Sequence, residues 1–280
     1  MKRFKIRDLI FLAVILIGIG SVGSWLTRDL HSEQGAPLEK TISDGEFTSV
    51  DITANNGRIE FFPSQDGTAR IIMNGGTGRR ELSADIVDEV LVVNALEGFQ
   101  FVNVDFRRLD MSLAVYLPVK EYDLLKATTQ NGAIAINGFA AADMEFRTSN
   151  GRIAASDLAG DRLAFQSSNG RLDISGITGS VSLRTTNGRI NLADITGDIE
   201  AVSSNGRIEW SNPTIAQNVD LRTTNGRIDV QLSQEPESAS INGRTSNSSI
   251  EIFGQSTDSW SSGTDYDVTL TTSNSPIRVN

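Results

Sequence analysis

The chain contains no cysteine and a single histidine, His31, among its 280 residues. Without cysteine it can form neither a disulfide bond nor a thiolate-ligated metal site, and it has no thiol for a lipid anchor. One histidine cannot form a multi-histidine metal centre, and because His31 lies just past an apolar run near the amino terminus we expect no Ser-His-Asp triad either. We therefore expect no metal ion and no cofactor.

Positive charge is also scarce. Lysine and arginine number 25 against 35 acidic residues, and the net charge of −10 argues against nucleic acid as a partner. The acidic residues are spread singly, whereas glycoside hydrolysis needs a carboxyl pair about 5–10 Å apart. The glycine-rich run Gly75–Gly78 lacks the following helix pattern of a phosphate-binding loop. These absences predict a protein that is not an enzyme, with a polysaccharide-active β-helix enzyme as an alternative.

A long uncharged run occurs near the amino terminus. Leu9–Leu26 comprises 18 residues without a charge, just long enough to span a bilayer, and it follows a basic segment. This pattern predicts a cytoplasmic tail over 1–8, a transmembrane signal anchor over 9–26 and a linker over 27–46. A signal peptide cut near residues 21–23 is the alternative. With the anchor kept, the protein crosses the inner (cytoplasmic) membrane once, and its C-terminal domain lies in the periplasm or on the extracellular side.

From residue 128 to residue 280 a short unit repeats, typified by Arg184-Thr-Thr-Asn-Gly-Arg-Ile190. Its period of 18 to 20 residues, which lengthens towards the end, is typical of a solenoid. Asn-Gly tolerates positive φ at two adjacent positions, so we expect each pair to turn a sharp corner. The predicted corners are Asn131, Gly132, Asn150, Gly151, Asn169, Gly170, Asn187, Gly188, Asn205, Gly206, Asn225 and Gly226.

Apolar and polar residues alternate within each unit, which is the spacing of a β-strand. Alignment of the units places like residues in columns, one of which contains Ile153, Leu172, Ile190, Ile208 and Ile228. The sequence thus predicts an all-β fold, a parallel β-helix or β-solenoid of about 18–20 residues per coil, preceded by one transmembrane helix. Hairpins at Asn-Gly would instead give an antiparallel meander or a propeller, although propeller blades need about 40 residues.

The first part of the predicted β region, residues 47–127, has no clear period. We expect it to form irregular β-coils that cap the regular coils of 128–280, with a short helix over Ser83–Glu89. An open solenoid end invites pairing with another chain, and therefore end-to-end self-association. Pro276 and Arg278 on the last strand are expected to blunt this end.

Two columns of arginine are expected on the outer surface. A binding stripe for an anionic polymer, such as lipopolysaccharide, teichoic acid or an acidic polysaccharide, is the functional interpretation. A ladder neutralised by Asp173, Glu209 and Asp229 is the structural one, and it is favoured because like charges under 5 Å apart repel unless neutralised. The candidate residues are Arg152, Arg171, Arg189, Arg207 and Arg227 after the glycine, and Arg147, Arg184, Arg222 and Arg244 before the asparagine.

A hydrophobic anchor, the run Leu113–Pro118 and the Asn-Gly-Arg-Ile repeats together give a family resemblance. Phe47 to Asn280 resembles the β-helix proteins of the bacterial envelope known as "putative adhesins", which are related to the toastrack domains of envelope-stress regulators. The resemblance implies a right-handed β-helix on the outer side of the inner membrane. It brings no set of functional residues with it.

The sequence therefore favours a non-enzymatic, membrane-anchored envelope protein, an adhesin or interaction scaffold that presents a repetitive solenoid surface. Its expected partners are an envelope protein or an anionic glycan, together with the membrane through residues 9–26. Many weak and evenly spaced contacts would add up to useful avidity. An accessory or sensor component of an envelope-stress system is the alternative, with residues 9–26 pairing with a membrane partner.

Overall fold

The computed structural model describes residues 36–42, 47–65, 67–76, 79–98 and 111–280. The chain divides into two units, Met1–Glu33 and Gln34–Asn280, and all described residues belong to the second. The predicted tail, the anchor and most of the linker lie outside the described residues. None of these described ranges contains a helical segment that could span a bilayer.

The described residues form 22 β-strands. In chain order they are β1 (Leu38–Ile42), β2 (Ser49–Ala54), β3 (Arg58–Ser64), β4 (Ala69–Asn74), β5 (Arg80–Val87), β6 (Val90–Glu97), β7 (Ser112–Pro118), β8 (Glu121–Thr129), β9 (Ile134–Asn137), β10 (Ala140–Thr148), β11 (Ile153–Ser167), β12 (Leu172–Thr185), β13 (Ile190–Thr196), β14 (Ile199–Ser203), β15 (Ile208–Asn212), β16 (Val219–Thr223), β17 (Ile228–Leu232), β18 (Ala239–Arg244), β19 (Ile250–Ile252), β20 (Ser259–Ser261), β21 (Tyr266–Thr271) and β22 (Ile277–Val279).

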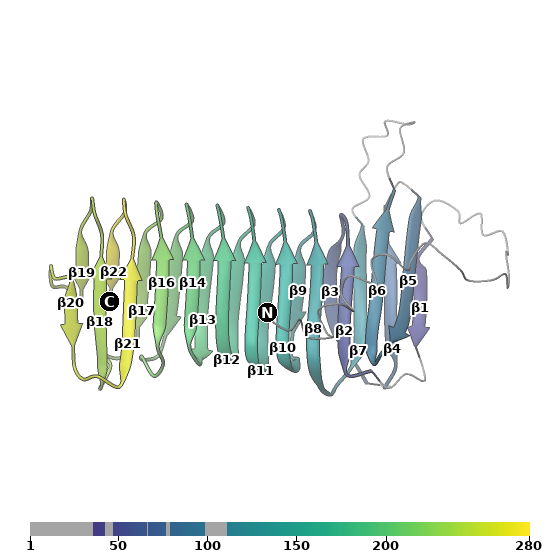
Figure 1. Cartoon of the computed structure of the whole chain (residues 1–280), viewed down its shortest axis with the longest axis horizontal. Helices are drawn as coiled ribbons and strands as arrows, with labels where there is room; N and C mark the ends of the chain where they lie inside the picture. The colour runs from purple at the N-terminus through teal and green to yellow at the C-terminus, as the bar shows by residue number, and fades with distance from the viewer. Residues whose placement is uncertain (1–35, 43–46, 66, 77–78, 99–110) are drawn as a thin grey trace, which may run out of the picture. The chain divides into compact units, whose positions relative to one another are not determined.

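The coils stack in parallel, as predicted. β10 pairs with β11 and β11 with β12, so that Phe146 lies beside Phe165 and Ile153 beside Leu172. Along each strand the inward residues are buried, and the residues between them are half-buried or exposed. This parallel register contradicts the hairpin alternative and gives an all-β, mostly parallel fold, as a β-solenoid has (Figure 1).

The core is a set of side-chain columns. Phe146 and Phe165 are nearly fully buried and stack with ring centroids 5.7 Å apart. Leu183 and Ala201 continue this column, each 0% exposed. Burial of one such large apolar side chain contributes about 1.5–3 kcal/mol, so stacking is favourable only if neighbouring coils keep their register.

Two faces can be followed from one end of the stack to the other. Face A runs β5–β6–β2–β8–β10–β11–β12–β14–β16–β21–β18–β20. Face B runs β1–β4–β7–β3–β9–β11–β12–β13–β15–β17–β22–β19. The long strands β11 and β12 belong to both faces, and their first halves lie on face B.

The last coil does not lie at the end of the stack. β21 pairs with β16 and β18, and β22 pairs with β17 and β19. The C-terminal strand is therefore inserted between two coils, and the expectation that Pro276 and Arg278 blunt an open end is wrong. The chain first forms β18 and β19 at the outer end and then returns to insert β21 and β22 between them and β16 and β17 (Figure 1). The longer last repeats supply the chain length that this return requires.

The first coil is inserted in the same way. β2 pairs with β6 and β8, while β3 pairs with β7 and β9. After β3 the chain passes outward to build the coil of β6 and β7, and it then returns to continue the regular stack. Each end of the described β unit thus has an inserted coil that is covered on both sides.

Antiparallel strands complete the two ends. β5 pairs with β6 along its whole length, from Arg80 opposite Glu97 to Val87 opposite Val90. The helix expected over Ser83–Glu89 is therefore wrong, because this stretch forms one strand of a hairpin whose turn lies at Asp88 and Glu89 (φ 49° and 63°). β1, which pairs with β4, shows that the β unit begins within the stretch predicted as a linker.

The corner glycines are required for a different reason from the one predicted. Each coil has a second corner, where the chain passes from face B to face A, and positive φ occurs there, at Gly138 (73°), Asp157 (53°), Gly176 (63°) and Asp194 (53°). It does not occur in the Asn-Gly pairs that were predicted as corners. At the Asn-Gly corners the backbones approach so closely that a Cβ on Gly151 would overlap the carbonyl oxygen of the preceding corner glycine. Glycine is therefore needed there for the stacking of coils and not for a left-handed conformation.

Candidate functional site

A continuous ladder of asparagine side chains runs along the Asn-Gly corner. Each Nδ2 donates to the Oδ1 of the neighbouring coil at 2.7 Å, except for a 2.8 Å bond from Asn247 to Asn274. We call this exposed line the asparagine edge. In spatial order it contains Asn56, Asn131, Asn150, Asn169, Asn187, Asn205, Asn225, Asn274 and Asn247.

Hydroxyl groups hold the backbone behind the asparagine edge. Thr148 Oγ1 donates to the carbonyl oxygen of Gly132 at 3.0 Å and accepts from the Gly151 amide at 3.0 Å. Ser167 repeats the pattern one coil further, donating to the carbonyl oxygen of Gly151 at 3.1 Å. These small inward hydroxyls therefore satisfy buried backbone groups, which leaves the amide ladder as the exposed part of the corner.

Replacement of Asn187 with alanine should destabilise the chain by about 1–2 kcal/mol, because its side chain both donates to Asn169 and accepts from Asn205. Asn247 is the control, since it forms the last ladder bond by donating to Asn274. Urea unfolding should give about half the loss for Asn247→Ala. Equal losses would mean that the ladder bonds do not stabilise the corner.

The first arginine column lies on face B directly after the corner. Arg152 Nε and Arg227 Nε each lie 2.5 Å from a carboxylate oxygen, of Asp173 and Asp229 respectively. Arg189 and Arg207 also approach carboxylates: Arg189 lies 3.9 Å from Glu209, while Arg207 pairs with Glu209 and lies 3.8 Å from Asp229. Guanidinium and carboxylate groups therefore interleave along the stack.

The second column lies on face A, but its arginines occupy alternate coils. Gln166 separates Arg147 from Arg184, and Val202 separates Arg184 from Arg222. Thr271 of the inserted strand then separates Arg222 from Arg244. At about 4.8 Å per coil, these arginines stand about 10 Å apart.

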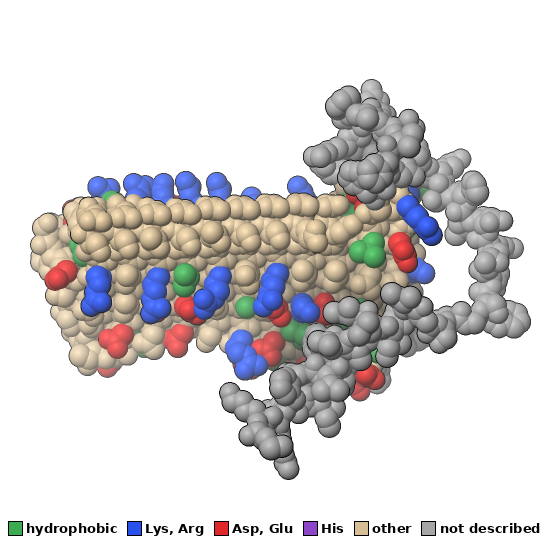
Figure 2. Space-filling model, turned by 45° about the horizontal axis from the view of Figure 1, so that its top comes forward, with side chains coloured by type: hydrophobic (Ala, Val, Ile, Leu, Met, Phe, Trp, Pro, Cys, Tyr) green, Lys and Arg blue, Asp and Glu red, His purple; other side chains and the backbone are tan. Residues whose placement is uncertain are grey.

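Carboxylates accompany the second column as well. Arg147 pairs with Glu145, Arg184 with Glu200 at 2.8 Å, and Arg222 with Asp220. Desolvation raises the pKa of the Asp220 carboxyl above its ordinary value, although Arg222 acts in the opposite direction. Both columns flank the asparagine edge, and Figure 2 shows two lines of basic side chains with a band of other residues between them.

Most of the predicted arginine stripe is thus neutralised. Seven of its nine residues have a carboxylate partner, and within the described ranges Arg171 and Arg244 have none. Exposed ion pairs contribute only about 0–1 kcal/mol each, so a ligand can displace them at little cost. Binding of a ligand to this stripe stays a prediction.

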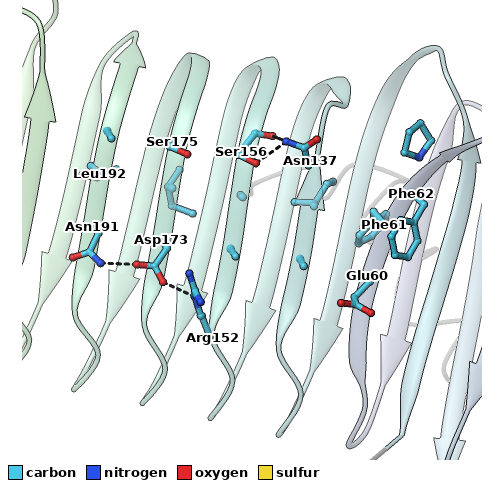
Figure 3. Close-up of a pocket in the computed structure, with 17 residues that line it drawn as sticks. Glu60, Phe61, Phe62, Asn137, Arg152, Ser156, Asp173, Ser175, Asn191 and Leu192 are labelled. Atoms are coloured by element: carbon cyan, nitrogen blue, oxygen red, sulfur yellow. Dashed lines mark hydrogen bonds and ion pairs between the residues drawn. The ribbon is translucent and has the colours of Figure 1, made fainter.

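An open hollow of about 610 Å³ lies on face B (Figure 3). β3, β9, β11, β12 and β13 contribute its walls and floor. At one end lie Phe62 and Pro63, and at the other Arg152, Asp173 and Asn191. The outward residues of the floor are small, namely Ala135, Ala154, Ser156, Ser175 and Ala193. We refer to this feature as the face-B hollow.

The polar end of the face-B hollow is an ordered cluster. Asn191 Nδ2 donates to Asp173 Oδ1 at 2.5 Å, while Arg152 Nε lies 2.5 Å from the other carboxylate oxygen of Asp173. On the floor, Asn137 Nδ2 donates to Ser156 Oγ at 2.7 Å and to Asp157 Oδ2 at 2.9 Å. Figure 3 shows both groups beside the open floor.

The aromatic end is also fixed in place. Phe62, which is 37% exposed, stacks on Tyr116 with ring centroids 5.1 Å apart. The guanidinium of Arg70 lies 4.7 Å from the centroid of the Tyr116 ring. A cation on the ring face and a stacked neighbour both restrain the two aromatic side chains.

The carboxylates of the hollow do not form a hydrolytic pair. Glu60 and Asp173 occupy the same outward row, with Ala135 and Ala154 between them. Three coil spacings separate them by about 14 Å, beyond the roughly 5–10 Å that glycoside hydrolysis uses. Nor do the described residues contain a group of three or more His, Asp or Glu side chains placed to hold a metal ion.

The sequence reasoning missed the face-B hollow, although two signals were present. The outward position that carries Asp173, Asn191 or Glu209 in later repeats carries alanine in the repeats of β9 and β11. A second phenylalanine, Phe62, follows the inward Phe61 and must therefore point outward.

Comparison with known proteins places the chain in a family. None of the curated proteins matches it. Similar solved structures include a "putative adhesin" from Bacteroides fragilis, with 14% identity, coverage of 88% of this chain and 97% of that one, and a TM-score of 0.49. Another from Parabacteroides distasonis shows 10% identity, coverage of 88% and 98%, and a TM-score of 0.38.

The family model of the toastrack domain DUF4097, a domain of unknown function, matches residues 94–280. This span contains all the regular coils and both arginine columns, and it begins before the coil of β8 and β9. The chain therefore belongs to the toastrack DUF4097 family.

Proposed function

We propose that the chain is a non-enzymatic scaffold of the cell envelope that binds an anionic glycan along its asparagine edge. Residues 9–26 would anchor it in the inner membrane, with the β unit on the periplasmic or extracellular side. The basic segment before the uncharged run supports this orientation. The stress-regulation and enzyme alternatives stay predictions.

The observation that carries the proposal is the regular exposed edge. Amide groups repeat there at every coil, about 4.8 Å apart, and arginines flank them on both sides. The ladder and the core columns hold these groups at fixed spacing. A long polymer can therefore make many weak contacts at once, each of which adds to the overall avidity.

Charge also favours an anionic ligand at this edge over a neutral one. Arg171 and Arg244 have no carboxylate partner among the described residues, and Arg184 and Arg222 have more exposed partners that a polymer carboxylate or phosphate can replace. Binding should weaken steeply with salt, since these exposed charges are screened over about 10 Å at 0.1 M ionic strength.

Reversal of two edge charges tests this proposal. The double variant Arg171→Glu with Arg184→Glu should bind polygalacturonate about tenfold more weakly at low salt, measured by biolayer interferometry on the full chain. The control is Arg162→Glu with Lys120→Glu, which changes the net charge equally but lies at the opposite end of the face-A strands from the edge. Equal binding by both double variants and the unchanged chain would refute the proposal.

A further inference from the structure

We infer that the face-B hollow is a binding site for a short segment of neutral oligosaccharide, with Phe62 stacking against the apolar face of a sugar ring. This inference rests on the proposed function in that both concern glycans. It names a separate site and a different ligand charge. The three features that support it are the small floor, the fixed aromatic wall and the self-neutralised polar end.

The floor is low because small residues replace larger ones. Ala135 and Ala154 occupy the row that continues with Asp173 and Asn191, and Ser156 lies in the next row. A row of short side chains leaves an open space above the β-strands, and the larger residues at the two ends of the row bound this space. This space spans about three coil spacings, or about 14 Å, which suits an extended oligosaccharide better than a single small molecule.

The aromatic wall is suited to a sugar ring. Phe62 exposes 37% of its surface, lies outside the core and makes no contribution to the inward columns, so its ring is free to contact a ligand. Its stacking on Tyr116, which Arg70 covers, holds it in one orientation before a ligand arrives. The C–H groups of a pyranose face are apolar and slightly positive, so they pack well against the negative face of an aromatic ring.

The polar end supplies both acceptors and donors for hydroxyl groups. Asp173 is held by Arg152 and Asn191, so its carboxylate is oriented, and Asn137 adds an amide on the floor. Fixed groups of this kind bind a ligand at a lower cost in conformational entropy than mobile ones do.

The charges around the hollow balance each other. Asp173 pairs with Arg152, and Glu60 at the other end lies 3.4 Å from Arg58. A charged ligand would therefore have to break one of these pairs and leave its partner uncompensated. Neutral sugar hydroxyls need no such exchange, which is why the inferred ligand is neutral.

The test uses the full chain with cello-oligosaccharides and chito-oligosaccharides as neutral probes. Phe62→Ala removes the stacking surface, and Ala154→Arg fills the floor; each should weaken the binding of the neutral probe by about tenfold or more in isothermal titration. Each has a matched control. Ile86→Ala removes an apolar side chain that is also 37% exposed, and Ala164→Arg makes the same change on a half-buried position of face A. Both controls should bind as the unchanged chain does.

The outcomes separate this inference from the proposed function. If neutral probes fail to bind, or bind equally to all four variants, the inference is wrong even if polygalacturonate still binds the asparagine edge. If neutral binding is lost in Phe62→Ala and Ala154→Arg but polygalacturonate binding fails, the hollow is supported and the proposal for the edge is rejected. If neither probe binds, both are rejected.

Discussion

Gly170→Ala is expected to destabilise the chain by about 3 kcal/mol or more, which is near the upper end for an overpacked site. A Cβ at this position would overlap the carbonyl oxygen of Gly151 and crowd Ser167 Oγ. The obstructing atom is backbone within the stack, so it can move only if coils separate. Thermal and urea unfolding of the purified variant would measure the loss.

Gly138→Ala provides the control, because the two glycines are needed for different reasons: Gly170 for close packing between coils, and Gly138 for its left-handed backbone conformation. Gly138 has a φ of 73°, but a Cβ there would meet nothing within 4 Å. Alanine should cost only about 1–2 kcal/mol in this left-handed conformation. Gly138→Asp should cost less, since Asp157 and Asp194 adopt the same conformation one and three coils further on. A larger loss for Gly138→Ala than for Gly170→Ala would contradict the packing argument.

These two glycines show what could be predicted from the repeat and what could not. The columns, the parallel register and the position of the corners follow from side-chain identity at a fixed period, because a core column needs like residues at like positions. The conformation at the corner does not follow, since Asn-Gly is compatible both with positive φ and with close backbone approach. The distance between neighbouring coils decides between positive φ and close backbone approach. This distance depends on how whole coils stack, so the sequence of one corner does not reveal it.

The arginines show a similar division. Their outward direction followed from alternation, and the interleaved carboxylates beside Arg152 and Arg227 were expected. The even spacing of the second column was not, because a repeat does not reveal that Thr271 of an inserted strand lies between Arg222 and Arg244. The face-B hollow was missed for the same reason, since it depends on β3 lying beside β9, far along the chain.

Insertion of the last coil leads to the second large expected effect. Deletion of Tyr266–Asn280 should abolish the protection of residues 239–252 against hydrogen exchange. β21 and β22 are the only parallel partners of β18 and β19 within the described residues. Without β21 and β22 the outer strands have no parallel strand to pair with, and the core residues Ile241 and Ile252 lose the buried neighbours that these two strands supply. Protection in β11 and β12 should persist, since repeat stability is dominated by nearest neighbours.

A point variant tests the same dependence without shortening the chain. Leu270 is 0% exposed in the inserted strand, so Leu270→Asp places a charge in the core and should unfold the same outer strands. Thr269→Asp puts the charge on the exposed side of the adjacent position and is the control. Had the coils stacked in chain order, β18 would lie directly on β16, and residues 239–252 would stay protected in the deletion variant. Retained protection there would show that the outer coil can close onto β16 and β17, and that insertion of the C-terminal coil is not what holds this end together.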